Sequence, residues 1–189
     1  GKKINIIDTP GYTDFTGEVK CGLGVVDAAI LLLKAFGGVE VGAEVVWRYT
    51  EESQNAVVLV VNKLNHENAK FEQVAQQARE RLGNDVAVIQ FPVRQGIGFD
   101  AVVDVLRMKL LRFGSDGKGK YTEEEIPNDL RSQAEKYREE LIEKIAESDE
   151  TLLNTFFEKG ALSDDEVRAG LKEALKKRKI YPILCSVAT

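Results

Sequence analysis

The sequence is poor in the residues that build metal sites and disulfide frameworks. It contains one histidine, His66, and two cysteines, Cys21 and Cys185, which lie far apart along the chain. Metal sites need clusters of ligating side chains at short spacing, and disulfide frameworks need several paired cysteines. We therefore expect two free thiols, a cytoplasmic location in reducing surroundings, and an exposed His66 with no metal site around it.

Long apolar runs and an excess of positive charge are also lacking. The longest apolar runs cover residues 28–33 and 56–61, whereas a membrane-spanning helix needs about 20 apolar residues. The formal net charge is -5, which excludes a chain that clamps nucleic acid through overall positive charge. Apolar residues make up 43% of the chain and charged residues 30%, which is typical of soluble globular domains.

The first part of the chain has an α/β pattern. Residues 4–7 form a short apolar run that ends in a turn, and this predicts a strand. The runs 28–33 and 56–61 are rich in Val, Ile and Leu without alternation, which favours strands buried on both faces of a parallel sheet. Residues 40–49 and 68–82 have helical spacing, and Gly83 ends the second of these helices.

A second pattern begins near residue 84. Residues 86–93, 99–105 and 110–113 read as strands, with Gly96 and Gly98 in the turn between the first two. A glycine-rich loop follows at 114–120. Pro127 suits the first turn of a long helix, and Ser163 followed by Glu166 is a capping box for a last helix that runs to about residue 179. The long helix has an apolar stripe of Leu130, Ala134, Tyr137, Leu141 and Ile145. A strand at 181–186 closes the chain.

Asp8-Thr9-Pro10-Gly11 is the strongest chemical signal. A nucleotide hydrolase needs a carboxylate at a strand end to hold Mg²⁺, directly or through water. It also needs a backbone N–H that approaches the γ-phosphate closely, which favours a glycine such as Gly11. Taken alone, the tetrapeptide is equally well a simple turn.

Two further polar segments follow predicted strands. Asn62-Lys63-Leu64-Asn65 comes after the run 56–61, where an Asn can brace a loop and a Lys can lay its stem over a purine ring. Cys185-Ser186-Val187-Ala188 closes the last strand, where backbone N–H groups can face a base oxygen. Each segment alone is also compatible with a plain polar turn or strand end.

Together, the three segments resemble the third, fourth and fifth G motifs of a translational GTPase. The flanking residues Gly11-Tyr12-Thr13-Asp14-Phe15 and Gly37-Gly38-Val39-Glu40, with Thr50 after Trp47-Arg48, resemble elongation factor G. That family carries an insert, the G′ subdomain, between the fourth and fifth motifs, and Phe91-Pro92-Val93 followed by Asp104-Val105 fits its start. The resemblance covers essentially the whole chain.

The resemblance implies an α/β fold, namely a partial P-loop GTPase parallel sheet with an α+β G′ insert. We expect a partial G domain at 1–83, the insert at 84–179, and the last G-domain strand with the fifth motif at 180–189. The implied function is GTP binding and hydrolysis, with GTP or GDP and Mg²⁺ as ligands, driving translocation on the ribosome.

The resemblance also implies roles for individual residues. Asp8 would hold Mg²⁺ through water, Pro10 and Gly11 would lie at the γ-phosphate, and Tyr12 would sit beside the attacking water. Guanine recognition would fall to Asn62, Lys63, Asn65, Ser186, Val187 and Ala188.

Two residues depart from the family pattern. Tyr12 stands where elongation factor G has a His, and a phenol with a pKa of about 10 cannot replace a protonated imidazole near pH 7. Asn65 stands where the family has an Asp, and an amide offers one acceptor where guanine presents two donors. An alternative function is therefore a ribosome-binding module with impaired hydrolysis.

The largest departure is that no G-x-x-x-x-G-K-[ST] segment, the phosphate-binding loop, occurs in the chain. We expect the chain to be part of a longer protein and, by itself, to be inactive with no nucleotide bound. The strand that leads into that loop would lie between residues 4–7 and residues 28–33. Residues 3–7 are then expected to close up against 28–33 or to pair with another copy as a strand-exchanged oligomer, rather than to lie loosely on the surface.

A row of acids recurs along the long helix. Glu135, Glu139, Glu143 and Glu147 lie at every fourth position, opposite the apolar stripe. A solvated helix face explains this pattern, and so does a docking surface. The resemblance implies the second, because the G′ subdomain of elongation factor G contacts the ribosomal stalk protein.

Overall fold

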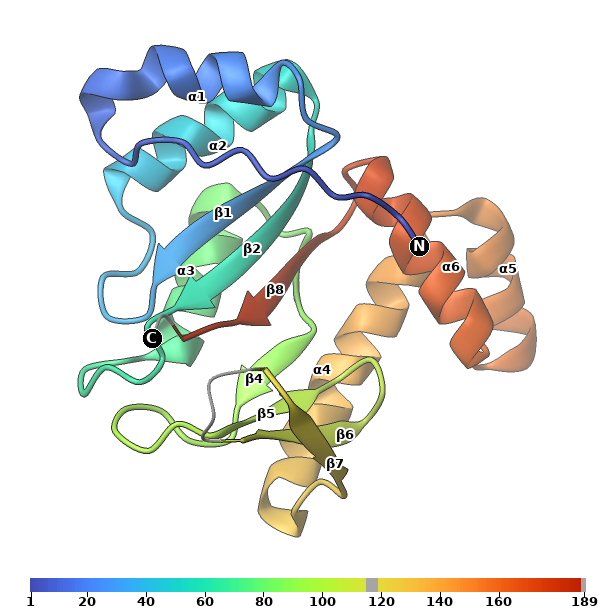
Figure 1. The fold of residues 1–189 in the computed structure, drawn as a ribbon. Helices are drawn as coiled ribbons and strands as arrows, with labels where there is room; N and C mark the ends of the chain where they lie inside the picture. The colour runs from blue at the N-terminus through green and yellow to red at the C-terminus, as the bar shows by residue number, and fades with distance from the viewer. Residues whose placement is uncertain (115–118, 188–189) are drawn as a thin grey trace.

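The computed structural model describes residues 1–114 and 119–187, and it contains two four-stranded sheets with helices around them (Figure 1). The first sheet is parallel, in the order β1-β2-β8-β3. Its strands are β1 (Ala28–Lys34), β2 (Ala56–Asn62), β3 (Val86–Val88) and β8 (Tyr181–Cys185). The apolar runs thus form parallel strands, as their lack of alternation predicts.

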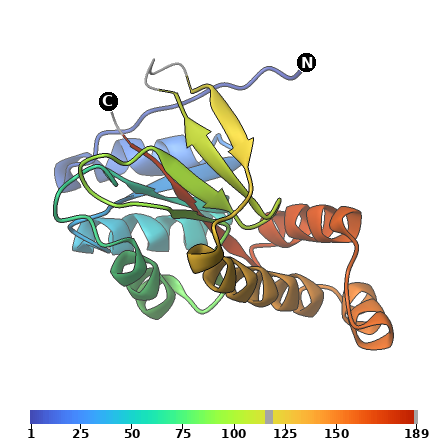
Figure 2. The ribbon, with the colours of Figure 1, turned by 90° about the horizontal axis from the view of Figure 1, so that it is seen from below.

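Helices cover one face of the parallel sheet. Figure 2 shows α2 (Val41–Ser53), α3 (Phe71–Leu82) and α4 (Asn128–Glu147) along one side of the sheet, with the N-terminal trace on the other. Trp47 of α2 lies edge-on to Tyr181 of β8, with 4.6 Å between ring centroids. Helix α3 buries one stripe, which consists of Phe71, Val74, Ala75, Ala78 and Leu82. The helical periodicity therefore identifies the face that packs on the sheet.

The second sheet is antiparallel, in the order β4-β5-β6-β7. Its strands are β4 (Gln90–Pro92), β5 (Ala101–Asp104), β6 (Lys109–Phe113) and β7 (Tyr121–Glu124). Three helices follow: α4, α5 (Glu150–Lys159) and α6 (Asp164–Lys176). The predicted capping box at the start of α6 is present, because Ser163 and Glu166 bond each other's backbone N–H groups.

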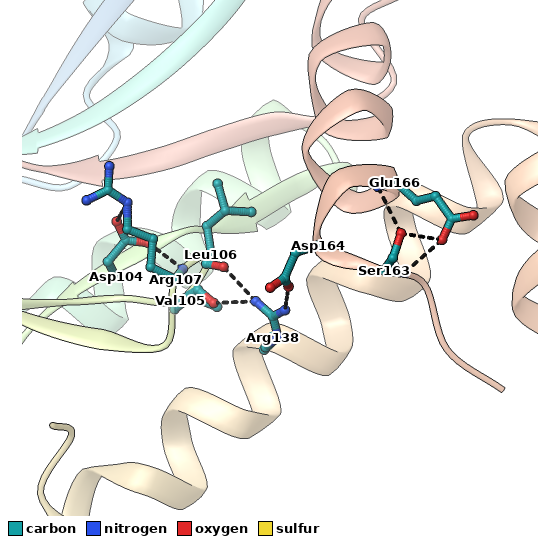
Figure 3. A network of polar contacts seen from close by, with 8 residues as sticks. All are labelled: Asp104, Val105, Leu106, Arg107, Arg138, Ser163, Asp164 and Glu166. Atoms are coloured by element: carbon teal, nitrogen blue, oxygen red, sulfur yellow. Dashed lines mark hydrogen bonds and ion pairs between the residues drawn. The ribbon is translucent and has the colours of Figure 1, made fainter.

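Arg138 ties α4 to the sheet and to α6 (Figure 3). Its guanidinium donates to the carbonyls of Val105 and Leu106, at 3.1 and 2.7 Å, and pairs with the Asp164 carboxylate at 2.7 Å. The Arg138 side chain is largely buried, so its charged hydrogen bonds to the two carbonyls are stronger than exposed ones, whereas the pair with the exposed Asp164 carboxylate contributes little. They fix the rotation of α4 about its axis and hence the side chains that it presents to solvent.

The strand predicted at residues 4–7 is wrong. These residues have no regular structure, and the side chains of Ile4 and Ile6 are 81% and 89% exposed. Within the described residues, β1 is an edge strand and takes no partner from residues 3–7. The expected closure against residues 28–33 is therefore also wrong, and the segment lies on the surface. Apolar residues alone do not make a strand without a neighbouring backbone to bond.

Other differences concern elements that the sequence pattern merged or missed. The predicted strand 86–93 is two strands in different sheets, because Ile89 bonds Ile183 through its N–H and Val105 through its carbonyl. Strand β7 and helices α1 (Thr16–Leu23) and α5 were not predicted. The predicted glycine-rich loop falls partly on residues 115–118, outside the described residues. The remaining predicted strands and helices are confirmed, with shifted ends.

Candidate functional site

The turn after β2 presents two polar side chains to solvent. The Asn62 side chain accepts a hydrogen bond from the N–H of Lys63 at 2.7 Å, and Lys63 adopts a φ of 62°. Leu64 is fully buried and anchors the turn, whereas Lys63 and Asn65 are exposed. An Asn that bonds its own following backbone is a standard device for a tight turn. The turn of residues 62–66, hereafter the base turn, therefore directs Lys63 and Asn65 outward from a buried anchor.

The end of β8 lies beside the base turn. The N–H of Ser186 donates to the carbonyl of Val61 at 2.9 Å, and the N–H of Leu64 donates to the carbonyl of Ser186 at 3.4 Å. The segments predicted as the fourth and fifth G motifs are thus neighbours at the carboxyl edge of the parallel sheet, where α/β folds place ligands. Ser186 and Val187 are half-buried, and Ala188 lies outside the described residues.

Cys185 precedes this edge, and its thiol is unreactive. Its N–H donates to the side-chain oxygen of Gln90 at 3.3 Å. Burial, and secondarily the carboxylate of Glu72, raises the pKa of the Cys185 thiol well above its ordinary value. The thiol therefore stays protonated at neutral pH and is a poor nucleophile. Both cysteines are free, as expected from the sequence.

A loop after β1 supports the base turn from another side. The N–H of Ala35 donates to the carbonyl of Asn62 at 2.9 Å, and the ring of Phe36 stacks on His66 with 4.1 Å between centroids. His66 is half-buried rather than exposed, so that expectation is wrong. The sequence could not reveal this contact, because the two rings come from different strand ends.

Sequence reasoning predicted a turn at Gly96 and Gly98 but missed what the turn of residues 94–98 contacts. The N–H of Gly96 donates to the carbonyl of Leu64 at 2.8 Å, and the side chain of Gln95 accepts the N–H of Phe71 at 2.6 Å. The only sequence signal was the pair Gly96 and Gly98, which have φ values of 82° and 91°. Spacing predicts a turn there but not what the turn touches.

Residues 8–12 lie elsewhere. Asp8, Pro10 and Gly11 are exposed, and the side chain of Tyr12 is 78% exposed. Figure 1 shows this segment beside the start of α1, away from the edge at which β1 and β2 end. The described structure thus brings Asn62, Lys63, Asn65 and Ser186 together but does not bring Asp8 or Tyr12 to them.

The carboxylates do not form a cage for a metal ion. Within residues 1–114 and 119–187, no group of three or more His, Cys, Asp or Glu side chains could hold one. Protein sites usually bind Mg²⁺ through one or two carboxylates together with nucleotide phosphates and water. The single carboxylate of Asp8 fits that use only where phosphate oxygens complete the coordination.

The row of acids on α4 is a separate feature. Glu135, Glu139, Glu143 and Glu147 are all exposed. The opposite side of the helix buries Ala134, Tyr137, Leu141 and Ile145, as the stripe predicts. The Tyr137 hydroxyl donates to the Glu72 carboxylate of α3, and burial followed by this bond raises the pKa of Tyr137. Helix α4 is therefore fixed to the parallel sheet through α3, with its acidic face outward. We call these four residues the acidic face.

Among the described residues, none of the helices combines the length and the apolar character that crossing a bilayer requires.

Comparison with known proteins assigns this chain to a family. Residues 1–188 match the family described as the elongation factor Tu GTP binding domain. A crystal structure from Thermus thermophilus superposes with a TM-score of 0.86 at 29% sequence identity. The match covers 95% of this chain and 26% of the Thermus chain, so this chain spans about a quarter of that protein. The α/β fold predicted from the sequence is confirmed, and the chain belongs to the family of translational GTPase G domains.

Proposed function

We propose that this domain is the G domain of an elongation factor of the G type, which binds and hydrolyses GTP to drive translocation on the ribosome in the cytoplasm. The observation that carries the proposal is the contact between the base turn and Ser186 at the carboxyl edge of the parallel sheet, in a chain of this family. The three-part division at 1–83, 84–179 and 180–189 belongs to the same proposal, although β3 pairs in the first sheet.

The residues of this edge suit a guanine base. Lys63 carries a long aliphatic stem for the purine face, Asn65 offers hydrogen-bonding groups to the base edge, and Asn62 holds the turn. Backbone N–H groups at Val187 and Ala188 would face the base oxygen. Asp8, Pro10, Gly11 and Tyr12 would serve the phosphates and the attacking water after moving to this edge. Bound Mg²⁺ would neutralise charge on the phosphates.

Translocation itself tests the proposal. Because the chain spans about a quarter of the Thermus protein that it matches, the experiment uses the full-length protein. Added to ribosomes that hold a peptidyl-tRNA before translocation, it should move the tRNA when GTP is present and much more slowly with a non-hydrolysable analogue. Ribosome binding without tRNA movement would contradict it.

Tyr12 and Asn65 favour a second candidate, a ribosome-binding module with impaired hydrolysis. A phenol at this position can donate a hydrogen bond to water or phosphate but cannot carry the charge of an imidazolium near pH 7. The candidate predicts GTP-dependent ribosome binding with no turnover above the spontaneous rate.

Asn65 should narrow the preference for GTP over XTP in the complete protein. Xanthine carries an oxygen where guanine carries its exocyclic NH₂, and the Asn65 amide can donate to that oxygen. A mismatched polar pair costs about 1–3 kcal/mol, so Asn65→Asp should widen the GTP/XTP affinity ratio by roughly tenfold. Competition binding with the two nucleotides measures the ratio. An unchanged ratio would show that Asn65 does not contact the base.

The acidic face should bind a basic partner, for which we propose the ribosomal stalk protein. Replacing all four residues by Lys should lower the association rate roughly tenfold at low salt and flatten its salt dependence. Stopped-flow binding measures both. The matched control reverses four exposed acids elsewhere, namely Glu18, Glu51, Glu67 and Glu158. If both variants change the association rate equally, the acidic face is only a solvated helix face and not a docking surface.

We also propose that this chain forms a strand-exchanged oligomer. The edge of β1 is open among the described strands, and its residues Ile30 and Leu32 are 69% and 59% exposed. Ile6 in the N-terminal segment is also exposed. Exposed edges recruit strands from other chains. Sedimentation should therefore detect a dimer that Ile6→Asp dissociates and the surface control Phe157→Asp does not. A monomer at all concentrations would contradict the pairing.

A further inference from the structure

The turn of residues 94–98 belongs to one sheet and touches the loop of the other. It connects β4 to β5 in the antiparallel sheet, yet two of its hydrogen bonds reach the segment that runs from β2 into the start of α3. Gly96 bonds the carbonyl of Leu64 in the middle of the base turn, and Gln95 bonds the N–H of Phe71 where α3 begins. One turn therefore holds the segment 62–71 at two points.

The bond from Gln95 meets a need of the helix. The first N–H groups of an α-helix have no partner within the helix and are usually satisfied by a capping side chain. The N-cap of α3 is Lys70, whose side chain makes no capping bond. Gln95, which is distant in sequence, supplies the acceptor for Phe71 at 2.6 Å. The start of α3 thus depends on the second sheet for its cap.

The backbone of the turn is shaped for this approach. Gly96 is buried and has a φ of 82°, a conformation that residues with a side chain rarely adopt. A Cβ there would lie 3.6 Å from the carbonyl oxygen of His66, so the two loops run closely past each other. The approach leaves the carbonyl of Leu64 bonded, while Lys63 and Asn65 on either side stay exposed.

We propose that Gln95 is a positioning residue for guanine recognition: through Phe71, together with the bond from Gly96 to Leu64, it holds the base turn in the conformation that presents Lys63 and Asn65 to a guanine nucleotide. The inference rests on the proposed function. It assigns to the insert a part in base specificity, in addition to any contact with partners. Gln95 itself does not touch the base.

The test compares GDP and ADP binding by the complete protein. Gln95→Ala should weaken GDP binding roughly threefold to tenfold, as expected for one lost hydrogen bond. ADP binding should stay unchanged, because it depends on phosphate contacts. Gln95→Glu should restore GDP affinity, since a carboxylate also accepts the N–H of Phe71 and suits a helix start. The matched control is Gln76→Ala on α3, whose side chain bonds only Glu80 among the described residues.

Amide hydrogen exchange supplies a second readout that does not depend on affinity. In Gln95→Ala, residues 62–71 should exchange faster than in the unaltered protein, while α2 should exchange at the same rate. Equal losses of GDP and ADP binding, no recovery in Gln95→Glu, or unchanged exchange at 62–71 would overturn the positioning role. An unaltered protein that binds ADP as tightly as GDP would overturn the proposed function, and this inference with it.

Discussion

The 189-residue chain, prepared alone, should show no GTP binding in calorimetry, with a dissociation constant weaker than about 1 mM. Most of the affinity in such sites comes from backbone N–H groups and a Lys that surround the phosphates. No G-x-x-x-x-G-K-[ST] segment occurs in this chain. Among the described residues, only the base turn and Ser186 then remain as candidates for contact with the nucleotide, and they would contact its base.

The complete protein, titrated under the same conditions, is the control and should bind in the micromolar range or tighter. The expected difference is thus roughly a thousandfold or more. Micromolar binding of GTP by the isolated chain would mean that the base turn and its neighbours hold the nucleotide without a phosphate loop, and that the division of roles proposed above is wrong.

Tyr12→His in the complete protein should raise ribosome-stimulated GTP turnover by about tenfold to a hundredfold. A positioned imidazole that orients or deprotonates the attacking water contributes about 10²–10⁴ in rate, whereas a phenol only donates a hydrogen bond near neutral pH. Tyr12 is 78% exposed, so the substitution removes no core packing and the fold should survive it. Rapid-quench measurement of phosphate release gives the rate.

The companion variant is Tyr12→Phe, which removes the hydroxyl and keeps the ring. Turnover should fall in Tyr12→Phe if the hydroxyl bonds water or phosphate during hydrolysis. Identical rates for the Tyr, His and Phe proteins would show that this residue does not approach the attacking water in the ribosome-bound state.

Much of the fold was predictable because it depends on local patterns. The runs that form β1 and β2 are apolar without alternation, and a parallel sheet buried by helices is their natural place. The stripe of α4 and the capping box at Ser163 were also predictable, because helical spacing and capping involve residues close in sequence. These signals need no knowledge of distant contacts.

The errors arise where a distant contact decides. Residues 4–7 have the composition of a strand, but a strand exists only where a neighbouring backbone bonds it, and none of the described strands does so. Ile89 divides one predicted strand between two sheets because it bonds Ile183 and Val105 from different parts of the chain.

The candidate site shows the same division. The polar residues after β2 and β8 could be named from sequence, since strand ends in parallel sheets gather at one edge. The residues that support the base turn could not be predicted from sequence, because Phe36 and Gln95 come from other elements. No local pattern marks a Gln as the cap of a helix far along the chain.

The central claim is that this domain belongs to a GTP-hydrolysing factor that works on the ribosome. The most direct measurement is the rate of GTP hydrolysis by the complete protein with and without ribosomes. A factor of the G type should hydrolyse GTP slowly alone and many times faster with ribosomes, and leave ATP untouched. GTP hydrolysis at the same slow rate with and without ribosomes would contradict the claim.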